Sequence, residues 1–323
     1  MKYIAVDANK ALLFAEQELP EIGDDECLIK VVACGVNRAD LLQRDGKYPA
    51  PDGESPILGL EVSGDIVKCG TKVTEWQSGN KVFALVSGGG YAQYVKAKAS
   101  QLMPLPNSFT YQQGAASAEV FLTAYQSLFT IAKLKTSSKV LIHAGGSGVG
   151  CAAIQLAKAK QCLVAVTVSN ETKAKACMAL GADYAINYHL EDFVQFSKER
   201  IKEGFDVILD VVAGDYLTRN INIAAMDSQI VMLAMLGGRF SEPIDIAKLL
   251  MKRVTLTAST LRNRSDNYKA KLVSNFSKDF YRQLAQGEIN PVIDSIYPWQ
   301  DAELAHQKMA NNENIGKLIL TVD

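Results

Sequence analysis

The stretch from Val140 to Gly150, near the middle of the chain, constrains the fold more than any other. It is written Val-Leu-Ile-His-Ala-Gly-Gly-Ser-Gly-Val-Gly and continues directly into Cys-Ala-Ala-Ile-Gln-Leu-Ala-Lys. The aliphatic start predicts a buried parallel strand, the glycines a tight turn, and the following Ala, Ile and Leu spacing an amphipathic helix. Such a turn lets the backbone approach a pyrophosphate, whose charge the N–H groups at the helix start attract. It therefore predicts a dinucleotide-binding turn, with an ordinary tight strand-to-helix turn as the alternative.

Length and charge restrict the classes of protein that remain. The chain has 323 residues and a formal net charge of -1, which allows two domains with substantial cores. Without a Lys/Arg block, neither nucleic acid nor a membrane surface is expected as a partner, and a small molecule is. The absence of a long apolar run and of a leader pattern predicts a cytoplasmic location. The six scattered cysteines form no CxxC pair and are typical of reduced core residues.

The chain changes character near residue 106. Before that point, short β-rich runs separated by Gly, Pro and Asp predict a compact β domain, with strands at 27–33, 64–68, 81–86 and 90–95. Helices are expected near Tyr111 and Glu119. From Val140, strands at 140–143, 163–168, 184–187, 206–210, 230–235 and 254–259 alternate with helices at 171–180, 191–201, 216–225 and 244–250. This alternation predicts an α/β fold with a six-stranded doubly wound (Rossmann) parallel sheet.

A helix at 268–286 and a strand at 316–322 are interpreted as a return to the first domain. The expected division is therefore a β-rich catalytic domain at 1–121, a dinucleotide-binding domain at 122–264 and a return to the catalytic domain at 265–323.

The end of the second strand bears on the choice of dinucleotide. NAD sites usually place Asp or Glu there to bind the ribose 2′-hydroxyl. This strand instead ends Thr-Val-Ser169-Asn, with Lys173 one helical turn further on. Ser169, the helix start and Lys173 suit a 2′-phosphate, so NADPH is preferred over NADH. Glu171 is the counter-argument, and a first-turn acid favoured by the helix dipole is its simpler explanation.

Five motifs in order resemble the zeta-crystallin-like quinone oxidoreductases, a zinc-free branch of the medium-chain dehydrogenase/reductase superfamily. The resemblance spans nearly the whole chain and rests on 35–41, 56–64, 122–125, 143–150 and 314–317. It implies a GroES-like β-rich domain, an NADPH cofactor, a quinone or enone substrate and a homodimer, for which the exposed edge of 254–259 is the expected contact. One departure is Ser147, which stands where the family's turn has glycine.

The resemblance also assigns residues to the cofactor. By analogy, Gly145, Gly146, Ser147, Gly148 and Val149 form the pyrophosphate turn. Ser169, Lys173 and Tyr188 fall where relatives hold the 2′-phosphate, and Thr123, Gly237 and Asn314 fall near the nicotinamide and the cleft.

The superfamily's zinc enzymes offer a contrast. Catalytic zinc needs Cys and His ligands, but the corresponding positions here are Asn37 and Leu60, and the sequence Ser87-Gly-Gly-Gly stands in place of a four-cysteine lobe. Metal-free chemistry on an already electrophilic carbonyl is therefore expected. The charge that develops on its oxygen requires hydrogen-bond donors, for which Asn37 and Tyr48 are the catalytic candidates. An Asx-turn former and a loop aromatic are their structural alternatives, and Asp40 is interpreted as a helix-start carboxylate.

Three functions stay open at this point. The first is an NADPH-dependent quinone oxidoreductase, and the second is an enone or enoyl-thioester reductase on the same scaffold. The third is an NADPH-binding protein recruited to a structural or RNA-binding role, which the near-neutral charge does not favour. An enoyl thioester would need a basic entrance, and the sequence leaves Arg38, Arg44, Lys47 and Arg262 unplaced.

Overall fold

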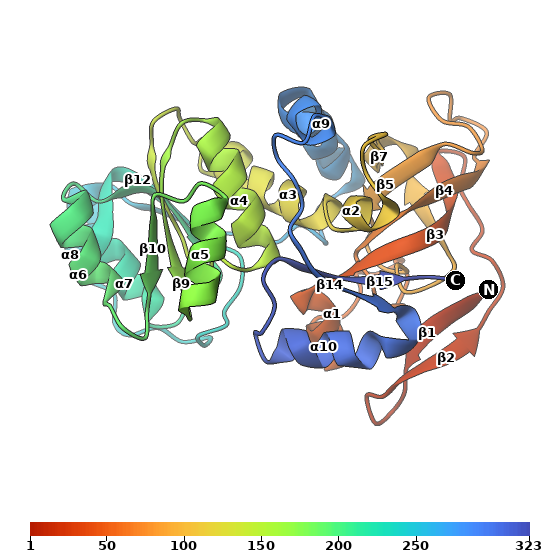
Figure 1. Cartoon of the computed structure of the whole chain (residues 1–323), viewed down its shortest axis with the longest axis horizontal. Coiled ribbons are helices and arrows are strands. Elements are labelled where there is room, and N and C mark those ends of the chain that lie inside the picture. Colours follow the sequence, from red (N-terminus) through yellow and green to blue (C-terminus); the bar gives the residue numbers. More distant parts are fainter. The chain divides into compact units, whose positions relative to one another are not determined.

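Two large sheets dominate the computed structural model, which describes residues 1–323 (Figure 1). The chain divides into two units: the first combines Met1–Leu122 with Leu261–Asp323, and the second is Thr123–Thr260. Each unit buries its own apolar cluster. The N- and C-terminal parts of the chain therefore share one core, while the middle part forms another.

The second unit is built on a parallel six-stranded sheet in the order β10-β9-β8-β11-β12-β13. The strands are β8 (Lys139–Ile142), β9 (Leu163–Val168), β10 (Tyr184–Asn187), β11 (Phe205–Asp210), β12 (Ala224–Met232) and β13 (Thr255–Ala258). The helices are α4 (Gly148–Ala159), α5 (Glu171–Ala179), α6 (Phe193–Phe196), α7 (Tyr216–Ile223) and α8 (Ile246–Lys252). The central strands are apolar because helices cover parallel sheets, and the predicted doubly wound sheet is confirmed.

The first unit holds a seven-stranded sheet in the order β14-β15-β3-β4-β5-β7, with β6 also paired to β3, and a separate β1-β2 hairpin. Its strands are β1 (Lys2–Val6), β2 (Leu12–Glu16), β3 (Glu26–Val36), β4 (Glu61–Cys69), β5 (Lys81–Leu85), β6 (Tyr94–Lys98), β7 (Leu102–Pro104), β14 (Ile293–Pro298) and β15 (Lys317–Thr321). Its helices are α1 (Arg38–Arg44), α2 (Tyr111–Ala115), α9 (Asp266–Ala285) and α10 (Ala302–Ala310), and α3 (Ala118–Tyr125) spans the boundary between the units. The separate β-rich domain is also confirmed.

Several predicted boundaries are wrong for local reasons. The strand expected at 90–95 starts only at Tyr94, because Gly90 packs against the backbone of Gly59, where a Cβ would lie 3.0 Å away. The strand expected at 230–235 begins at Ala224 and ends at Met232, so the preceding helix stops at Ile223. Strands β2 and β14 and helix α10 were not predicted, since short half-exposed segments carry little periodicity. None of the helices combines the length and the apolar character that crossing a membrane requires.

Candidate active site

The glycine turn after β8 is packed too closely for larger residues at two of its glycines. A Cβ on Gly145 would lie 2.6 Å from the side chain of Val166, and one on Gly150 would lie 2.5 Å from the carbonyl oxygen of Ala144. Ala144 itself has a φ of 54°. The first turn of α4 is thus held against the strand ends, with the N–H groups of Gly148 and Val149 at a helix start, where no intrahelical partner exists.

Ser147, the departure from the family's glycine pattern, is the N-cap of α4. Its Oγ accepts a hydrogen bond from the Gly150 N–H at 3.0 Å. A serine N-cap satisfies one of the orphan donors at a helix start. The substitution therefore fits the turn and leaves the hydroxyl proton available for donation.

Three residues assigned to the 2′-phosphate lie around the end of β9. The Tyr188 N–H donates to the Val168 carbonyl at 3.1 Å, which places Tyr188 beside the strand that Ser169 follows. The Lys173 side chain lies over the turn, because a Cβ on Gly146 would be 3.2 Å from its Cγ and Cδ. The sequence assignment therefore brings a lysine, a serine and a tyrosine to one edge of the sheet, next to the glycine turn.

The surroundings of Glu171 do not favour a ribose-binding role. Its side chain is 74% exposed and pairs with Lys175 of the same helix at 3.8 Å. An i,i+4 pair of this kind is an ordinary feature of a solvated helix face. Its place in the first turn of α5 agrees with its interpretation as a first-turn acid.

The remaining cofactor candidates lie in different surroundings. Thr123 is buried in α3, and its carbonyl accepts a hydrogen bond from the Ser127 hydroxyl at 2.7 Å. The Gly237 N–H donates to the Val212 carbonyl at 2.7 Å in the loop after β12. Asn314 belongs to the first unit, where its Nδ2 donates to the Gly316 carbonyl at 2.7 Å. Their roles toward the nicotinamide stay predictions.

Asn37 sits at the centre of a buried polar network in the first unit. Its backbone N–H donates to the Asp40 carboxylate at 2.7 Å at the start of α1. Its Nδ2 donates to Glu61 Oε1 at 3.0 Å, and its Oδ1 accepts from the Lys317 ammonium at 2.6 Å. Lys317 also forms an ion pair with Glu61 at 2.7 Å, and both side chains are buried. Charge-assisted bonds of this kind hold the Asn37 amide in one orientation.

This geometry favours a positioning role for Asn37, because both ends of its amide are already bonded within the protein. Sequence reasoning missed Glu61 and Lys317 as members of the site. A signal was available, since each is a charged residue inside an apolar run of a family motif. A buried ion pair needs both partners, and only the fold shows that β4 and β15 each supply one.

Asp40 links this network to a second chain of buried groups. Its carboxylate accepts from the Gly59 N–H at 3.0 Å and from the Tyr91 hydroxyl at 3.3 Å, and that hydroxyl also contacts His306 Nε2 at 3.0 Å. Burial raises the pKa of Asp40 to about 6. Burial together with the nearby Arg44 lowers the pKa of His306 to about 3, so the imidazole is neutral at neutral pH.

Tyr48 lies on the loop that follows α1 and is half-buried. The Arg262 guanidinium stands over its ring at 5.5 Å, while its hydroxyl makes no hydrogen bond within the protein. Burial raises the pKa of Tyr48 above its usual value, despite the opposing effect of Arg262. The phenol is therefore a protonated donor at neutral pH, as a role at a developing oxyanion requires.

The basic residues that the sequence left unplaced fall into two groups, according to whether they have a partner at or near the surface or are buried. Arg38 donates to the Met309 carbonyl and to Asn312, Arg44 pairs with Glu303 at 2.7 Å, and the exposed Lys47 pairs with Asp45 at 3.1 Å. Each of these three has a structural partner at or near the surface. Arg262, by contrast, is buried beside Tyr48.

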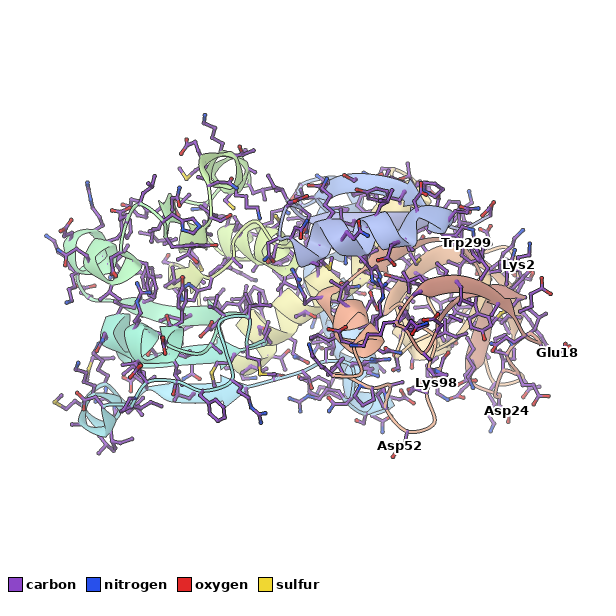
Figure 2. All side chains as sticks on the ribbon, turned by 90° about the horizontal axis from the view of Figure 1, so that it is seen from below. Lys2, Glu18, Asp24, Asp52, Lys98 and Trp299 are labelled. Carbon is purple, nitrogen blue, oxygen red and sulfur yellow. The ribbon has the colours of Figure 1, made fainter.

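A groove of about 510 Å³ lies elsewhere on the first unit, lined by Lys2, Phe14, Trp299 and Asp323 among others. Figure 2 shows Lys2 and Trp299 close together and Asp52 on a loop that projects from a different part of this unit. None of the predicted site residues lines the groove. No group of three or more His, Cys, Asp or Glu side chains is arranged to hold a metal ion, and all six cysteines are unpaired thiols.

Comparison with known proteins agrees with this architecture. Residues 23–107 match the alcohol dehydrogenase GroES-like domain, and residues 148–278 match the zinc-binding dehydrogenase domain. The chain is 30% identical to quinone oxidoreductase from Lama guanicoe, over 94% of this chain and 90% of that protein. It is 27% identical to human synaptic vesicle membrane protein VAT-1 homolog, over 93% and 80% of the two chains.

Among solved structures, Escherichia coli quinone oxidoreductase complexed with NADPH is similar, with a TM-score of 0.86, 26% identity and coverage of 99% of this chain and 98% of that one. The chain therefore belongs to the medium-chain dehydrogenase/reductase superfamily of nicotinamide-dependent oxidoreductases, and quinone oxidoreductases are among its homologues.

Proposed function

We propose that this chain is an NADPH-dependent quinone oxidoreductase, which reduces a quinone or a related electrophilic carbonyl without a metal. The observation that carries the proposal is the end of β9. Lys173 lies over the glycine turn there, Ser169 and Tyr188 lie at or beside the strand end, and Glu171 is exposed and paired with Lys175. A lysine at a helix start suits the extra phosphate of NADPH, whereas NADH sites use an acid. The similarity to quinone oxidoreductases supports the substrate class.

The residues present fit a nicotinamide dinucleotide. The turn leaves no space for a side chain at Gly145 or Gly150, and the helix that follows presents N–H groups at its start, as a pyrophosphate requires. When bound, the nicotinamide supplies hydride from C4. Tyr48 offers a protonated phenol whose hydroxyl is unused within the protein, and it would donate to the substrate oxygen as negative charge develops there. Asn37, held by Lys317 and Glu61, keeps the adjoining start of α1 in place.

The assembly and location follow as further parts of the proposal. β13 is an edge strand of its sheet, and edge strands with unpaired backbone groups are usually covered. We therefore propose a homodimer joined along β13. The near-neutral charge and the absence of a membrane-crossing helix support a cytoplasmic protein that acts on small molecules.

A steady-state screen tests the proposed function. NADPH and NADH oxidation would be followed with 9,10-phenanthrenequinone, with a simple enone and with crotonyl-CoA. We expect quinone reduction with a strong preference for NADPH. Reduction of crotonyl-CoA or of the enone without turnover of the quinone would overturn the substrate class, and equal use of NADH would overturn the cofactor.

A further inference from the structure

Two buried cations of the first unit, Arg262 and Lys269, converge on Ser87. Arg262 is 6% exposed and Lys269 is 3% exposed. The Arg262 Nε donates to the Ser87 carbonyl at 2.7 Å, and the Lys269 ammonium donates to the Ser87 hydroxyl at 2.7 Å. Neither cation forms an ion pair with a carboxylate. Two positive charges are thus buried around one neutral residue.

Arg262 also has hydrogen-bonding capacity that the protein does not use. Its Nη2 is buried without any partner, and its Nη1 reaches only the Tyr48 carbonyl at 3.5 Å. Buried polar groups are nearly always satisfied, so an orphaned guanidinium nitrogen requires an explanation. The guanidinium stands over the Tyr48 ring, which places this unused capacity beside the proposed donor to the substrate.

Lys317, another buried cation of this unit, shows how the chain neutralises such a charge within the protein. Lys317, buried to the same degree, has the Glu61 carboxylate at 2.7 Å. Carboxylates attract Arg262 and Lys269 only from a distance. Two of these carboxylates have other partners, because Asp40 accepts from backbone N–H groups and Asp266 accepts from Gln101. Burial lowers the pKa of both cations, as expected where a counter-charge is missing.

We propose that Arg262 and Lys269 form an anion subsite that binds an acidic group, a carboxylate, sulfonate or phosphate, on the quinone or carbonyl substrate beside Tyr48. The planar guanidinium suits two oxygens of such a group, and the ammonium adds a point charge. The inference rests on the proposed function, since it names the class of substrate that the same site takes. The same oxyanion chemistry also occurs in the phosphates of the dinucleotide, so the experiment separates these two sources.

The test compares 1,2-naphthoquinone with its 4-sulfonate as substrates of the full-length enzyme and of Arg262→Gln, Lys269→Met and Arg264→Gln. Arg264→Gln is the matched control. Arg264 lies two residues after Arg262, and its side chain is exposed and stacked on Tyr268, so the variant removes a positive charge close by in the chain but outside the subsite. We expect each subsite variant to lower the sulfonate-to-neutral ratio of kcat/KM by about tenfold or more, the loss typical of one hydrogen bond to a charged group. The control should change the ratio by less than about twofold. Arg262→Lys, which keeps the charge, should recover part of the loss.

Two binding measurements complete the test. The Kd of NADPH is measured without substrate, and the Kd of 1-naphthalenesulfonate is measured against that of 1-naphthol by titration calorimetry. If Arg262→Gln weakens NADPH and leaves the substrate ratio unchanged, the anion belongs to the dinucleotide and the proposal is wrong. If no variant alters either the ratio or naphthalenesulfonate binding, the cations are structural and the proposal is also wrong. Arg262-dependent sulfonate binding without quinone turnover would uphold the subsite and overturn only the quinone reductase function.

Discussion

At the scale of single residues, Lys173 carries the proposed cofactor choice. Hydrogen bonds to a charged group contribute roughly 1.5–3 kcal/mol, so Lys173→Ala should weaken NADPH binding about tenfold or more and leave NADH binding nearly unchanged. Lys175→Ala is the control, because Lys175 lies on the same helix and pairs with Glu171 at the surface. Fluorescence titration of both cofactors measures the effect. Equal weakening of NADPH and NADH by Lys173→Ala would refute the assignment.

Tyr48 is the second residue on which the proposed chemistry depends. Tyr48→Phe keeps the ring under Arg262 and removes only the hydroxyl, so it isolates hydrogen-bond donation. One oxyanion donor typically contributes about 10²–10³ in rate, but a quinone is intrinsically reactive, and we expect a loss of about tenfold in kcat. Tyr3→Phe, a half-buried tyrosine of β1, provides the control. Wild-type kcat/KM in Tyr48→Phe and in Tyr48→Ala would show that the site is misplaced.

Asp40 makes a prediction about pH and stability. Its folded pKa of about 6 exceeds the value of about 3.9 for an unfolded chain, so the folded state binds the proton more tightly. Ionisation of Asp40 therefore lowers the free energy of unfolding. This loss is absent below about pH 4, grows as the pH rises to about 6 and is constant at higher pH. Asp40→Asn cannot ionise and should therefore gain about 3 kcal/mol of unfolding free energy relative to wild type between pH 4 and pH 7. Urea denaturation at both pH values measures this difference, and a constant offset would contradict it.

At the scale of elements, the start of α4 depends on how closely the glycine turn approaches its neighbours. A Cβ on Gly150 would meet the Ala144 and Gly145 carbonyl oxygens at 2.5 and 2.6 Å, and backbone atoms cannot move aside as a flexible side chain can. Gly150→Ala should therefore displace the helix start and weaken dinucleotide binding by more than about tenfold, with a lower Tm. Gly23→Ala, whose Cβ would have ordinary contacts of 3.4 Å or more, is the control. Unchanged NADPH affinity in Gly150→Ala would show that the turn tolerates the methyl group.

The elements also differ in how well the sequence predicts them. β9 and β10 have the predicted bounds, because a buried parallel strand is a continuous apolar run that ends in turn residues. β6 begins later than predicted, since the path of residues 90–93 is set by contacts with Gly59 and Leu58 from another part of the chain. The local sequence pattern determines the bounds of an element only where no contact with a distant part of the chain overrides it.

At the scale of the whole molecule, the proposed homodimer is the main prediction. β13 is an edge strand of the six-stranded sheet. Residues 235–251, which precede it in the chain, include exposed large apolar side chains, among them Phe240 at 80% and Leu250 at 72%. An exposed apolar patch of this kind commonly marks an interface. Light scattering after size-exclusion chromatography should give about twice the 35.1 kDa of one chain, down to micromolar concentration. A mass of 35.1 kDa at all concentrations would exclude the dimer.

The sequence by itself determined the class of fold and the place of the glycine turn, because strand, glycine turn and helix are contiguous and their physics is local. It also led to the prediction for Ser169 and Lys173, which lie within one strand end and one helix turn. Only the tertiary structure decided that Lys317 and Glu61 hold Asn37, and that Arg262 and Lys269 converge on Ser87. These partners lie far apart along the chain, and a charged side chain has no pattern that reveals whether it will be buried. Burial and pairing are properties of the folded core, where the cost of removing a charge from water makes its partner decisive.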